Sequence, residues 1–391
     1  MQKSRMILAF SVLIGIFIFG CQQPSQNTPN TPAATQNKNI ILSDSDTGGF
    51  VRSVSIAENG KWLVAGFNNG KILHADLIAG TKTYNTIDNL TGQVAVRPAA
   101  GGKTVAFKIG DGSRVIAGVT DFKNDSWAGK FPAAFDMDTT PDLSVVAIVT
   151  LPPYNKNGEL FIETNKKEKD VRFSDSGAQA VSVSGSGKFI AVGNEGFDAL
   201  QPREGRPPVD KKWGFNGVSL YDKKGQLHWK YKTASPVDEV KVIEERSIVL
   251  AMTDASNLIA LNLKTGKKIW SHENAAWFAA NDKYILSGSN ENAALFDING
   301  ELIWKSSTYT AVVGGPCNLA LTEDGISIIY TSLGNVPADQ SKKEVVIFDK
   351  SGKVVWSEDI NTIDMMTCVA ISVDGKTWAV GTEKLEVFRA I

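Results

Sequence analysis

The chain has 391 residues, of which 42% are hydrophobic and 21% charged, so it is long enough to bury a sizeable core. Its 41 lysine and arginine residues nearly balance 42 aspartate and glutamate residues, and the charges are dispersed. Because binding to phosphates needs a basic face, this balance argues against a nucleic-acid-binding protein. Only three cysteines are present, which excludes a framework of disulfides.

The N-terminal segment, residues 1–21, has the layout of a secretory signal. Lys3 and Arg5 precede an uncharged apolar run from Met6 to Phe19, which is short for a membrane span, and Gly20-Cys21 follows. This ending resembles the lipobox of bacterial lipoproteins. The resemblance implies that Cys21 is lipidated and becomes the new N-terminus. The alternatives are an uncleaved anchor and an ordinary buried cysteine.

Residues 22–38 are predicted to be a disordered polar tether. They are rich in Gln, Asn, Thr and Pro and nearly lack large apolar groups, so they cannot bury enough surface to fold. Acyl chains on Cys21 would hold the protein at a membrane while the tether lets residues 39–391 stand away from it. We therefore expect an exported, lipid-anchored protein, on the periplasmic side of the outer membrane if the cell is Gram-negative.

Residues 39–391 are predicted to be all-β, because apolar and polar residues alternate at the strand period and no long stretch keeps the helical period. After an isolated strand at 39–42, hairpins with a glycine turn recur along the chain. Three of them are closely alike and a fourth copy is partial: 54–66, 181–193, 369–381 and 319–325.

A second repeat appears in the C-terminal half, where a turn glycine is followed four residues later by a tryptophan. A short apolar run that ends in Asp or Asn precedes each copy, which indicates a strand, a tight turn and a strand. The copies are Gly225 to Trp229, Gly266 to Trp270, Gly300 to Trp304 and Gly352 to Trp356.

The two repeats together define units of four strands, at about 50–90, 91–131, 132–173, 174–233, 234–273, 274–313, 314–360 and 361–391. The last unit has only three strands, and the isolated strand at 39–42 could supply the fourth. We therefore predict a single β-propeller of four-stranded antiparallel blades, closed by pairing of the N-terminal strand with the last blade. Eight blades are expected, with seven as the alternative. An open solenoid and a two-domain sandwich are the other architectures considered.

The glycine and tryptophan pattern, above all the stretch from Ala260 to Trp270, resembles the repeat of pyrroloquinoline-quinone-type propellers. The hairpins around Gly60, Gly187 and Gly375 resemble WD-repeat blades, although the Gly-His and Trp-Asp dipeptides are absent. With its lipidated cysteine, tether and eight blades, the chain is similar in overall plan to the BamB-type propeller lipoproteins of outer-membrane protein assembly. These resemblances imply a fold, whereas propellers host unrelated activities.

The four tryptophans are interpreted as blade-docking residues that fill the wedge between adjacent sheets. Quinone-dependent dehydrogenases of this fold, as the resemblance implies, use a vicinal cysteine pair and a carboxylate calcium site, and neither is readable here. Cys317 and Cys368 are 51 positions apart (368 − 317), and whether they pair is left open. We expect no cofactor, no metal and no catalytic residue. His74, His228 and His272 lack metal-ligand spacing and are interpreted as structural.

Three long insertions, at 152–158, 195–216 and 334–343, are all expected between the second and third strands of their units. Such connections emerge on one face, and insertions without a packing role often carry function. The candidate interaction residues are aromatic and basic, as in interface hot spots. They are Tyr154, Arg203, Arg206, Lys211, Lys212, Trp213 and Phe215. The competing interpretation is that the largest insertion is disordered or only covers the surface.

The sequence therefore favours a membrane-anchored, non-catalytic scaffold that binds protein partners in the cell envelope, in a process such as outer-membrane protein assembly. The alternative is an exported propeller enzyme, similar to lactonases or lyases, with a metal at the mouth of the channel. A hydrolase could gather carboxylates there from distant blades.

Overall fold

The computed structural model describes residues 38–45, 48–86, 93–110, 115–120, 125–131, 134–150, 158–164, 167–173, 176–196, 214–289, 292–307, 309–311, 318–333, 343–360 and 368–390. The predicted signal segment with Cys21 and the predicted tether up to residue 37 lie outside this part of the chain. Lys38, placed at the end of the tether, is instead the first residue of a strand.

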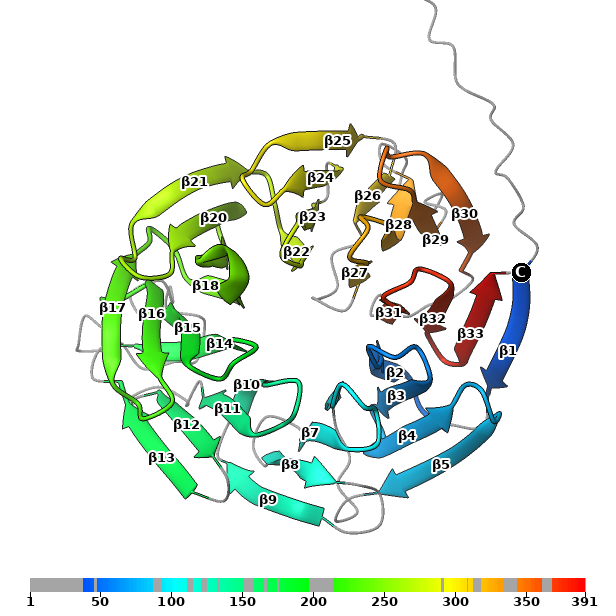
Figure 1. Ribbon diagram of the computed structural model, residues 1–391, viewed down its shortest axis with the longest axis horizontal. Coiled ribbons are helices and arrows are strands. Elements are labelled where there is room, and N and C mark those ends of the chain that lie inside the picture. Colours follow the sequence, from blue (N-terminus) through cyan, green and yellow to red (C-terminus); the bar gives the residue numbers. More distant parts are fainter. Residues whose placement is uncertain are drawn as a thin grey trace, which may run out of the picture. The chain divides into compact units, whose positions relative to one another are not determined.

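The described residues form eight antiparallel sheets arranged in a ring (Figure 1). In the first four blades the strands lie side by side in chain order, from the channel outward. Their strands are β2 (Val51–Ile56), β3 (Trp62–Phe67), β4 (Lys71–Asp76) and β5 (Thr81–Thr86); β6 (Gln93–Pro98), β7 (Val105–Gly110), β8 (Val115–Thr120) and β9 (Asp125–Phe131); β10 (Ala134–Thr139), β11 (Val145–Thr150), β12 (Glu159–Thr164) and β13 (Lys167–Arg172); and β14 (Gly177–Val183), β15 (Phe189–Glu195), β16 (Gly217–Asp222) and β17 (Leu227–Lys232).

The fifth to eighth blades continue the ring, and the helical structure in the described residues is one short 3-10 turn, η2 (Glu244–Arg246). Their strands are β18 (Val237–Ile243), β19 (Ile248–Thr253), β20 (Asn257–Asn262) and β21 (Lys268–Glu273); β22 (Trp277–Ala280), β23 (Tyr284–Gly288), β24 (Ala293–Asp297) and β25 (Leu302–Ser306); β26 (Tyr309–Ala311), β27 (Leu319–Leu321), β28 (Ser327–Leu333), β29 (Lys343–Phe348) and β30 (Val354–Asp359); and β31 (Cys368–Ile371), β32 (Thr377–Gly381), β33 (Leu385–Ala390) and β1 (Lys38–Asp44).

The ring is closed by β1, which pairs antiparallel with β33 and forms the outer strand of the eighth blade. Lys38 lies opposite Ala390, and Asp44 lies opposite Leu385. The backbone groups at the outer edge of β33 are thereby paired rather than left open. The predicted eight-bladed propeller and its closure by the N-terminal strand are confirmed, and the solenoid, sandwich and seven-blade alternatives are wrong.

One predicted boundary is wrong, because β26 was assigned to the sixth unit. Tyr309 pairs with Leu333 of β28, so β26 belongs to the seventh sheet. The other end of β28 pairs with β27, where Leu319 lies opposite Ile329. The seven-residue β28 thus pairs with two short inner strands, β26 and β27. The sequence pattern placed the start of the seventh unit next to β27 and left β26 in the sixth.

The core consists of eight apolar clusters, one between each pair of neighbouring blades. The cluster between the eighth and first blades, for example, includes Cys368, Val387, Val51 and Leu73. The corresponding layer between the fourth and fifth blades includes Val218 and Val249. The blades are therefore held face to face by burial of apolar surface, at about 25 cal/mol per Å². Cys317, whose pairing with Cys368 the sequence left open, lies outside the described residues.

The repeated glycine and tryptophan of successive blades contact each other. A Cβ added at Gly266 would lie 2.7 Å from the ring of Trp229, and one added at Gly300 would lie 2.8 Å from that of Trp270. Gly266 has a φ of +67°, which favours glycine independently of the contact. The Trp229 indole N–H also donates to the Leu263 carbonyl at 2.8 Å. The turn of one blade thus forms the seat for the tryptophan of the blade before it.

The third and eighth blades vary this arrangement. Gly352 seats Trp304 in the same way, at 2.7 Å, but the third blade has Val171 at the tryptophan position, with Gly225 against it. The eighth blade has β1 in place of an outer hairpin, so Trp356 packs against Trp378 instead, with ring centroids 5.2 Å apart. These substitutions explain why the signature is absent from the third unit.

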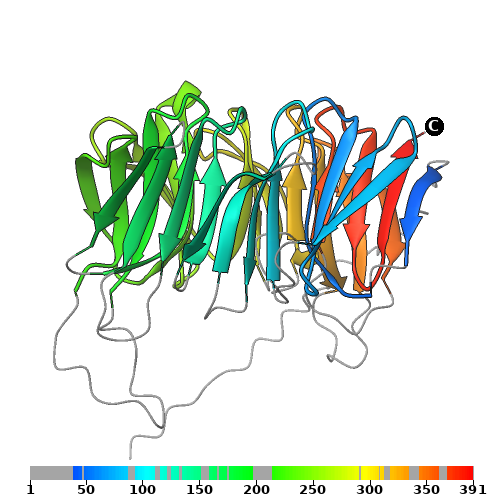
Figure 2. The ribbon, with the colours of Figure 1, turned by 90° about the horizontal axis from the view of Figure 1, so that it is seen from below.

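The blades have two faces, which Figure 2 shows from the side. We call the one at which the second strands end, at Thr150, Glu195 and Leu333 for example, the insertion face. The opposite one, with the turns that contain Gly60, Gly187 and Gly266, is called the turn face. Because β1 starts opposite Ala390, the end of the third strand of its blade, the described chain begins at the turn face.

Candidate recognition surface

The three predicted insertions begin and end at the insertion face. They connect β11 to β12, β15 to β16, and β28 to β29, which are the second and third strands of the third, fourth and seventh blades. Residues 151–157, 197–213 and 334–342 themselves lie outside the described residues. The candidate residues Tyr154, Arg203, Arg206, Lys211, Lys212 and Trp213 fall among them, and Phe215 is described.

The base of the largest insertion is fixed by hydrogen bonds within the fourth blade. The Gly196 amide donates to the side-chain oxygen of Asn216 at 2.6 Å. Asn194, which is buried, donates to the Ser176 hydroxyl at 3.1 Å and accepts from Ser219 at 2.7 Å. Since buried polar groups are costly unless bonded, this network holds the two ends of the insertion at a defined separation.

Phe215 is folded back onto its own blade, with only 9% of its surface exposed. The Lys230 ammonium lies 4.5 Å from the centroid of its ring, within the range of a cation–π contact. Gly217 has a φ of +153°, and a Cβ there would lie 2.0 Å from the Tyr231 carbonyl and 2.9 Å from the Phe215 ring. Phe215 therefore positions the end of the insertion and offers little ring surface to a partner.

A cavity of about 250 Å³ lies between the outer strands of the fourth and fifth blades. Tyr231 and Lys232 at the end of β17 form one wall, and Asn257 and Ile259 of β20 form another. Thr253 and Ser235 also line it, and both are engaged with backbone groups: the Asn257 and Ala255 amides donate to their hydroxyls at 3.3 and 3.2 Å. The cavity opens near the base of the largest insertion.

Three carboxylates influence each other at the insertion face, at the ends of β15 and β19 and the start of β18. Burial, followed by repulsion from Asp254 and then Glu195, raises the pKa of Asp238 to about 7. Burial and then Asp254 also raise the pKa of Glu195. No His, Cys, Asp and Glu side chains within the described ranges form a group of three or more that could hold a metal ion.

A second set of polar residues joins the innermost strands of neighbouring blades. Asp136 of β10 accepts a hydrogen bond from the Val181 amide of β14 at 2.9 Å, and Glu239 of β18 accepts one from the Phe278 amide of β22 at 3.3 Å. Ser53 of β2 donates to the Val94 carbonyl of β6 at 2.8 Å. These contacts bridge strands that do not pair with each other directly.

Burial controls the charge of this inner set. It raises the pKa of Glu239 to about 8, although the Phe278 amide opposes the shift, and it also raises the pKa of Asp136. The nearby Lys108 has its pKa lowered by burial, and its ammonium donates to the Phe135 carbonyl. Burial therefore favours the neutral form of each of these groups, and at Glu239 both the neutral and the charged forms are accessible near neutral pH.

Sequence reasoning missed the acidic residues of both sets. Ser53, Asp136 and Glu239 each follow a register shift in the first strand of a blade, so they occupy equivalent positions. An alignment of the first strands would have revealed two carboxylates at one repeat position. Glu195 and Asp254 are equivalent in the same way, because each directly follows the second-strand residue, Asn194 or Thr253, that pairs just before the register shift.

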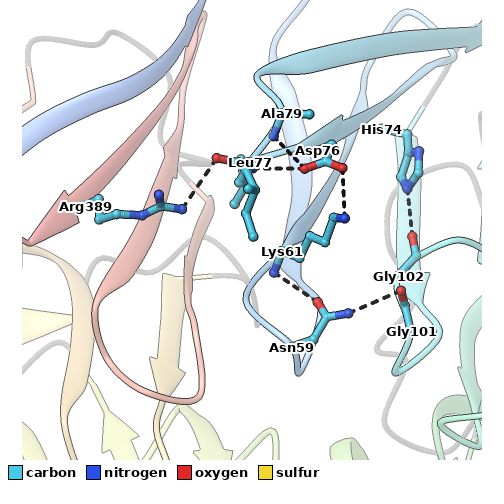
Figure 3. A network of polar contacts seen from close by, with 10 residues as sticks. Asn59, Lys61, His74, Asp76, Leu77, Ala79, Gly101, Gly102 and Arg389 are labelled. Carbon is cyan, nitrogen blue, oxygen red and sulfur yellow. Dashed lines mark hydrogen bonds and ion pairs between the residues drawn. The ribbon is translucent and has the colours of Figure 1, made fainter.

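His74 and His272 join adjacent blades, whereas His228 lies against Phe189 of its own blade, with ring centroids 6.0 Å apart. The ring of His74 contacts the Gly102 carbonyl of the next blade at 2.7 Å (Figure 3). The same ring stacks on Trp62, with centroids 4.5 Å apart. His272 contacts the Gly300 carbonyl in the same manner at 2.8 Å. Burial lowers the pKa of His74, so its neutral form is favoured.

The joint between the eighth, first and second blades carries a polar network at the turn face (Figure 3). Asp76 accepts from the Ala79 and Ile78 amides and forms an ion pair with Lys61 at 3.4 Å. Asn59 reaches the Gly101 carbonyl at 3.4 Å, and Arg389 reaches the Leu77 carbonyl at 3.5 Å. The network crosses the place where the ring closes, which is a structural role.

The comparisons with known proteins agree with this fold. The model of a family described as outer membrane protein assembly factor BamB matches residues 166–311, less than half of the chain. No curated protein matches the chain at a significant level. In the described part of the chain, no helix is both long and apolar enough to cross a membrane.

Solved structures match in large number, 1528 chains in all, so the fold by itself does not select an activity. One is the crystal structure of the C-terminal WD40 domain of Sif2, with a TM-score of 0.63 and 10% sequence identity. The match covers 90% of this chain and 98% of that one. At this identity it shows the fold alone. The chain is therefore a β-propeller of the quinone-repeat-like and WD-repeat-like kind.

Proposed function

We propose that the protein is a cell-envelope lipoprotein, anchored through Cys21, that acts as a non-catalytic scaffold for protein–protein interaction. The match of residues 166–311 to the BamB family supports outer-membrane protein assembly as the process it serves. In this proposal residues 22–37 form the tether between the anchor and the propeller.

The observation that carries the proposal is the position of the three insertions. All of them connect second to third strands, so blades that are far apart in the sequence present their extra residues on one face. Hydrogen bonds at Gly196, Asn216 and Asn194 hold the two ends of the largest insertion at the insertion face. Three insertions that begin and end at one face support a recognition surface.

The partner-binding residues in this proposal are the aromatic and basic ones of the third- and fourth-blade insertions: Tyr154, Arg203, Arg206, Lys211, Lys212 and Trp213. Side chains of these types dominate binding hot spots because they combine large contact area with directional polar groups. Phe215 contributes indirectly, through its contact with Lys230 at the base of the insertion.

In-cell photo-crosslinking tests the surface. A photoreactive residue at Arg206 or Trp213 should trap a protein partner, which affinity purification from detergent-solubilised membranes would recover. The control is the same residue at Lys264, an exposed position on the turn face. Equal or stronger crosslinking at Lys264 would contradict the assignment of the insertion face.

The anchor is tested by Cys21→Ala. The variant lacks the acceptor sulfur, so a processed chain should move from the membrane fraction to the soluble fraction when cell extracts are centrifuged. Membrane association of the processed variant at the wild-type level would rule out lipidation at this residue.

A second candidate function is an exported hydrolase with a divalent metal at the mouth of the channel. The observation nearest to it is the set of Glu195, Asp238 and Asp254 at the insertion face, two of which have raised pKa values. Within the described residues, however, these carboxylates do not form a group that could hold a metal ion. Elemental analysis of the purified full chain separates the two proposals. A divalent ion retained in a one-to-one ratio would support the enzyme and count against the scaffold alone.

A further inference from the structure

Exposed aliphatic side chains gather at the turn face. Of the large apolar residues that are exposed in the described part of the chain, only Tyr84 and Phe135 lie elsewhere. The others lie in the turns, or in the outer-strand halves next to them: Ile40, Ile78, Leu227, Ile269, Leu302, Ile303 and Val373. Single exposed apolar residues are ordinary, but their collection on one face of eight blades indicates a contact surface.

The fourth, fifth and sixth blades hold the densest group. Leu227, Ile269 and Leu302 stand at the start of consecutive outer strands and are 45%, 50% and 55% exposed. Ile303 lies beside Leu302 and is also exposed. The strands are neighbours in the ring (Figure 1), so the four side chains line one sector of the rim. We call these four residues, together with the exposed lysines of the turns that precede Leu227 and Ile269, the turn-face sector.

Two of the three turns in this sector carry exposed lysines, whereas the third has the exposed Glu301 beside Leu302. Lys223 and Lys224 lie in the turn before Leu227, and three more lysines, Lys264, Lys267 and Lys268, lie before Ile269; all five are exposed. The acidic residue of the first turn points inward, because Asp222 accepts hydrogen bonds from the Lys224 and Gln226 amides, each at 2.8 Å. Exposed aliphatic groups flanked by lysines match the interface of an anionic bilayer, where apolar groups enter and cations meet headgroups.

The start of the folded chain adds a geometric argument. Lys38 begins β1 at the turn face, so a tether of residues 22–37 leaves from this face. A flexible chain of that length has an end-to-end distance of roughly 20–25 Å. A blade strand of six residues spans about 20 Å from face to face. An anchor at Cys21 therefore keeps the turn face nearer to the bilayer than the insertion face.

We propose that the turn-face sector rests on an anionic lipid surface and that the insertion face is thereby directed away from the membrane. The inference rests on the proposed anchor at Cys21 and extends it from attachment to orientation. The long insertions then project toward partners that stand off from the bilayer. Docking of a protein on the turn face is the competing outcome of the test.

Lipid contact is measured on the processed full chain bound to vesicles. A bimane label at Ile269→Cys is compared with one at Ala255→Cys, an exposed turn at the insertion face, and with the unsubstituted chain as background. Vesicles of phosphatidylcholine with phosphatidylglycerol, containing nitroxide-labelled lipid, should quench the label at position 269 several-fold more than the one at 255. Phosphatidylcholine alone should give much weaker quenching.

A matched pair of triple variants tests the charge. Lys223, Lys264 and Lys267 changed to glutamine should lower the apparent affinity of the sector for the anionic vesicles, by about fivefold for each lysine. The control changes Lys232, Lys343 and Lys384, at the insertion-face ends of strands, and should have little effect. For both triple variants, the measurement is the salt dependence of the quenching of the bimane label at position 269.

Two results would overturn the proposal. Flotation of the vesicles measures whether the wild-type chain is bound to them. If the chain floats with the vesicles but the label at 269 is quenched no more than the one at 255, the proposed anchor at Cys21 is retained and the proposed orientation is wrong. If the chain does not float with either vesicle, the anchor on which the proposal rests fails, and the orientation with it.

Discussion

At the residue scale, the repeat works through pairs of side chains from successive blades. Trp304 is 8% exposed, faces Gly352 of the next turn and stacks on Phe348 with centroids 5.0 Å apart. The indole therefore belongs to the apolar layer between the sixth and seventh blades. Its neighbour Leu302, in the same strand, is more than half exposed and lies outside that layer.

Trp304→Ala is expected to lower the free energy of unfolding by about 3–5 kcal/mol, because it removes a buried ring and leaves a cavity. Leu302→Ala, the matched control, should change it by less than about 0.5 kcal/mol. Urea denaturation followed by circular dichroism measures both. Similar losses for the two variants would show that the ring does not carry the contact between the blades.

A comparison of Gly266 with Gly80 tests the close contact between Gly266 and the Trp229 ring. Both have φ near +67°, but a Cβ at Gly266 would overlap the Trp229 ring, whereas one at Gly80 meets nothing within 4 Å. Alanine at either position costs about 1–2 kcal/mol for the left-handed backbone. Gly266→Ala should cost a further 1–3 kcal/mol, roughly, for overpacking. Equal denaturation midpoints for the two variants would argue against a tight seat.

At the element scale, neighbouring inner strands are linked by side chains instead of backbone pairing. Glu239 of β18 accepts a hydrogen bond from the Phe278 amide of β22, and Asp136 of β10 accepts one from the Val181 amide of β14. Both residues are partly buried, and the pKa values of their carboxylates are raised. The links between blades therefore depend on pH.

Glu239→Gln is expected to flatten the dependence of stability on pH. Burial raises the pKa of Glu239 from 4.5 to about 8, so between these values the folded protein holds a proton that the unfolded chain releases. The free energy of unfolding therefore falls as pH rises through this window, by at most about 1.4 kcal/mol per pH unit for this group.

Glutamine keeps a carbonyl oxygen for the Phe278 amide and removes the titration. Urea denaturation at several pH values between about 5 and 8 should show a shallower fall for the variant than for the wild type. Asp136 and Asp238, whose pKa values are also raised, keep part of the fall in both proteins. Parallel curves would contradict the assignment to Glu239.

At the scale of the whole molecule, the ring depends on one strand from the other end of the chain. β1 covers the edge of β33, and Ile41 and Leu42 pack against the layer between the eighth and first blades. The side chain of Lys82 in the first blade also reaches the buried Asp44 of β1, at 3.1 Å.

Deletion of residues 38–44 should expose the edge of β33 and cause concentration-dependent association, because open strand edges pair with other chains. Light scattering and size-exclusion chromatography of the purified chain measure this. Deletion of residues 24–30, of equal length and within the predicted tether, is the control and should leave the chain as the wild type. A variant without β1 that stays in the wild-type state of association would show that the edge is otherwise protected.

The sequence by itself determined the architecture, because propeller blades are local units. Alternation at the strand period, glycine turns and the four tryptophans lie within stretches of about forty residues or fewer, so the repeat can be read without knowing any long-range contact. The three-stranded last unit and the isolated strand at 39–42 even predicted how the ring closes. The one boundary that failed, at β26, concerns a three-residue strand with too little pattern to read.

Only the tertiary structure decided which side chains meet across blades. Glu239 and Phe278 are 39 positions apart and Asp136 and Val181 are 45 apart, and no local pattern specifies such contacts. The folded-back position of Phe215 and the pKa of Asp238 likewise arise from the enclosure that packing produces. Of the proposed recognition surface, the sequence supplied the insertions, their residue types and the expectation of a common face, whereas the fold decided that this face lies opposite the start of β1.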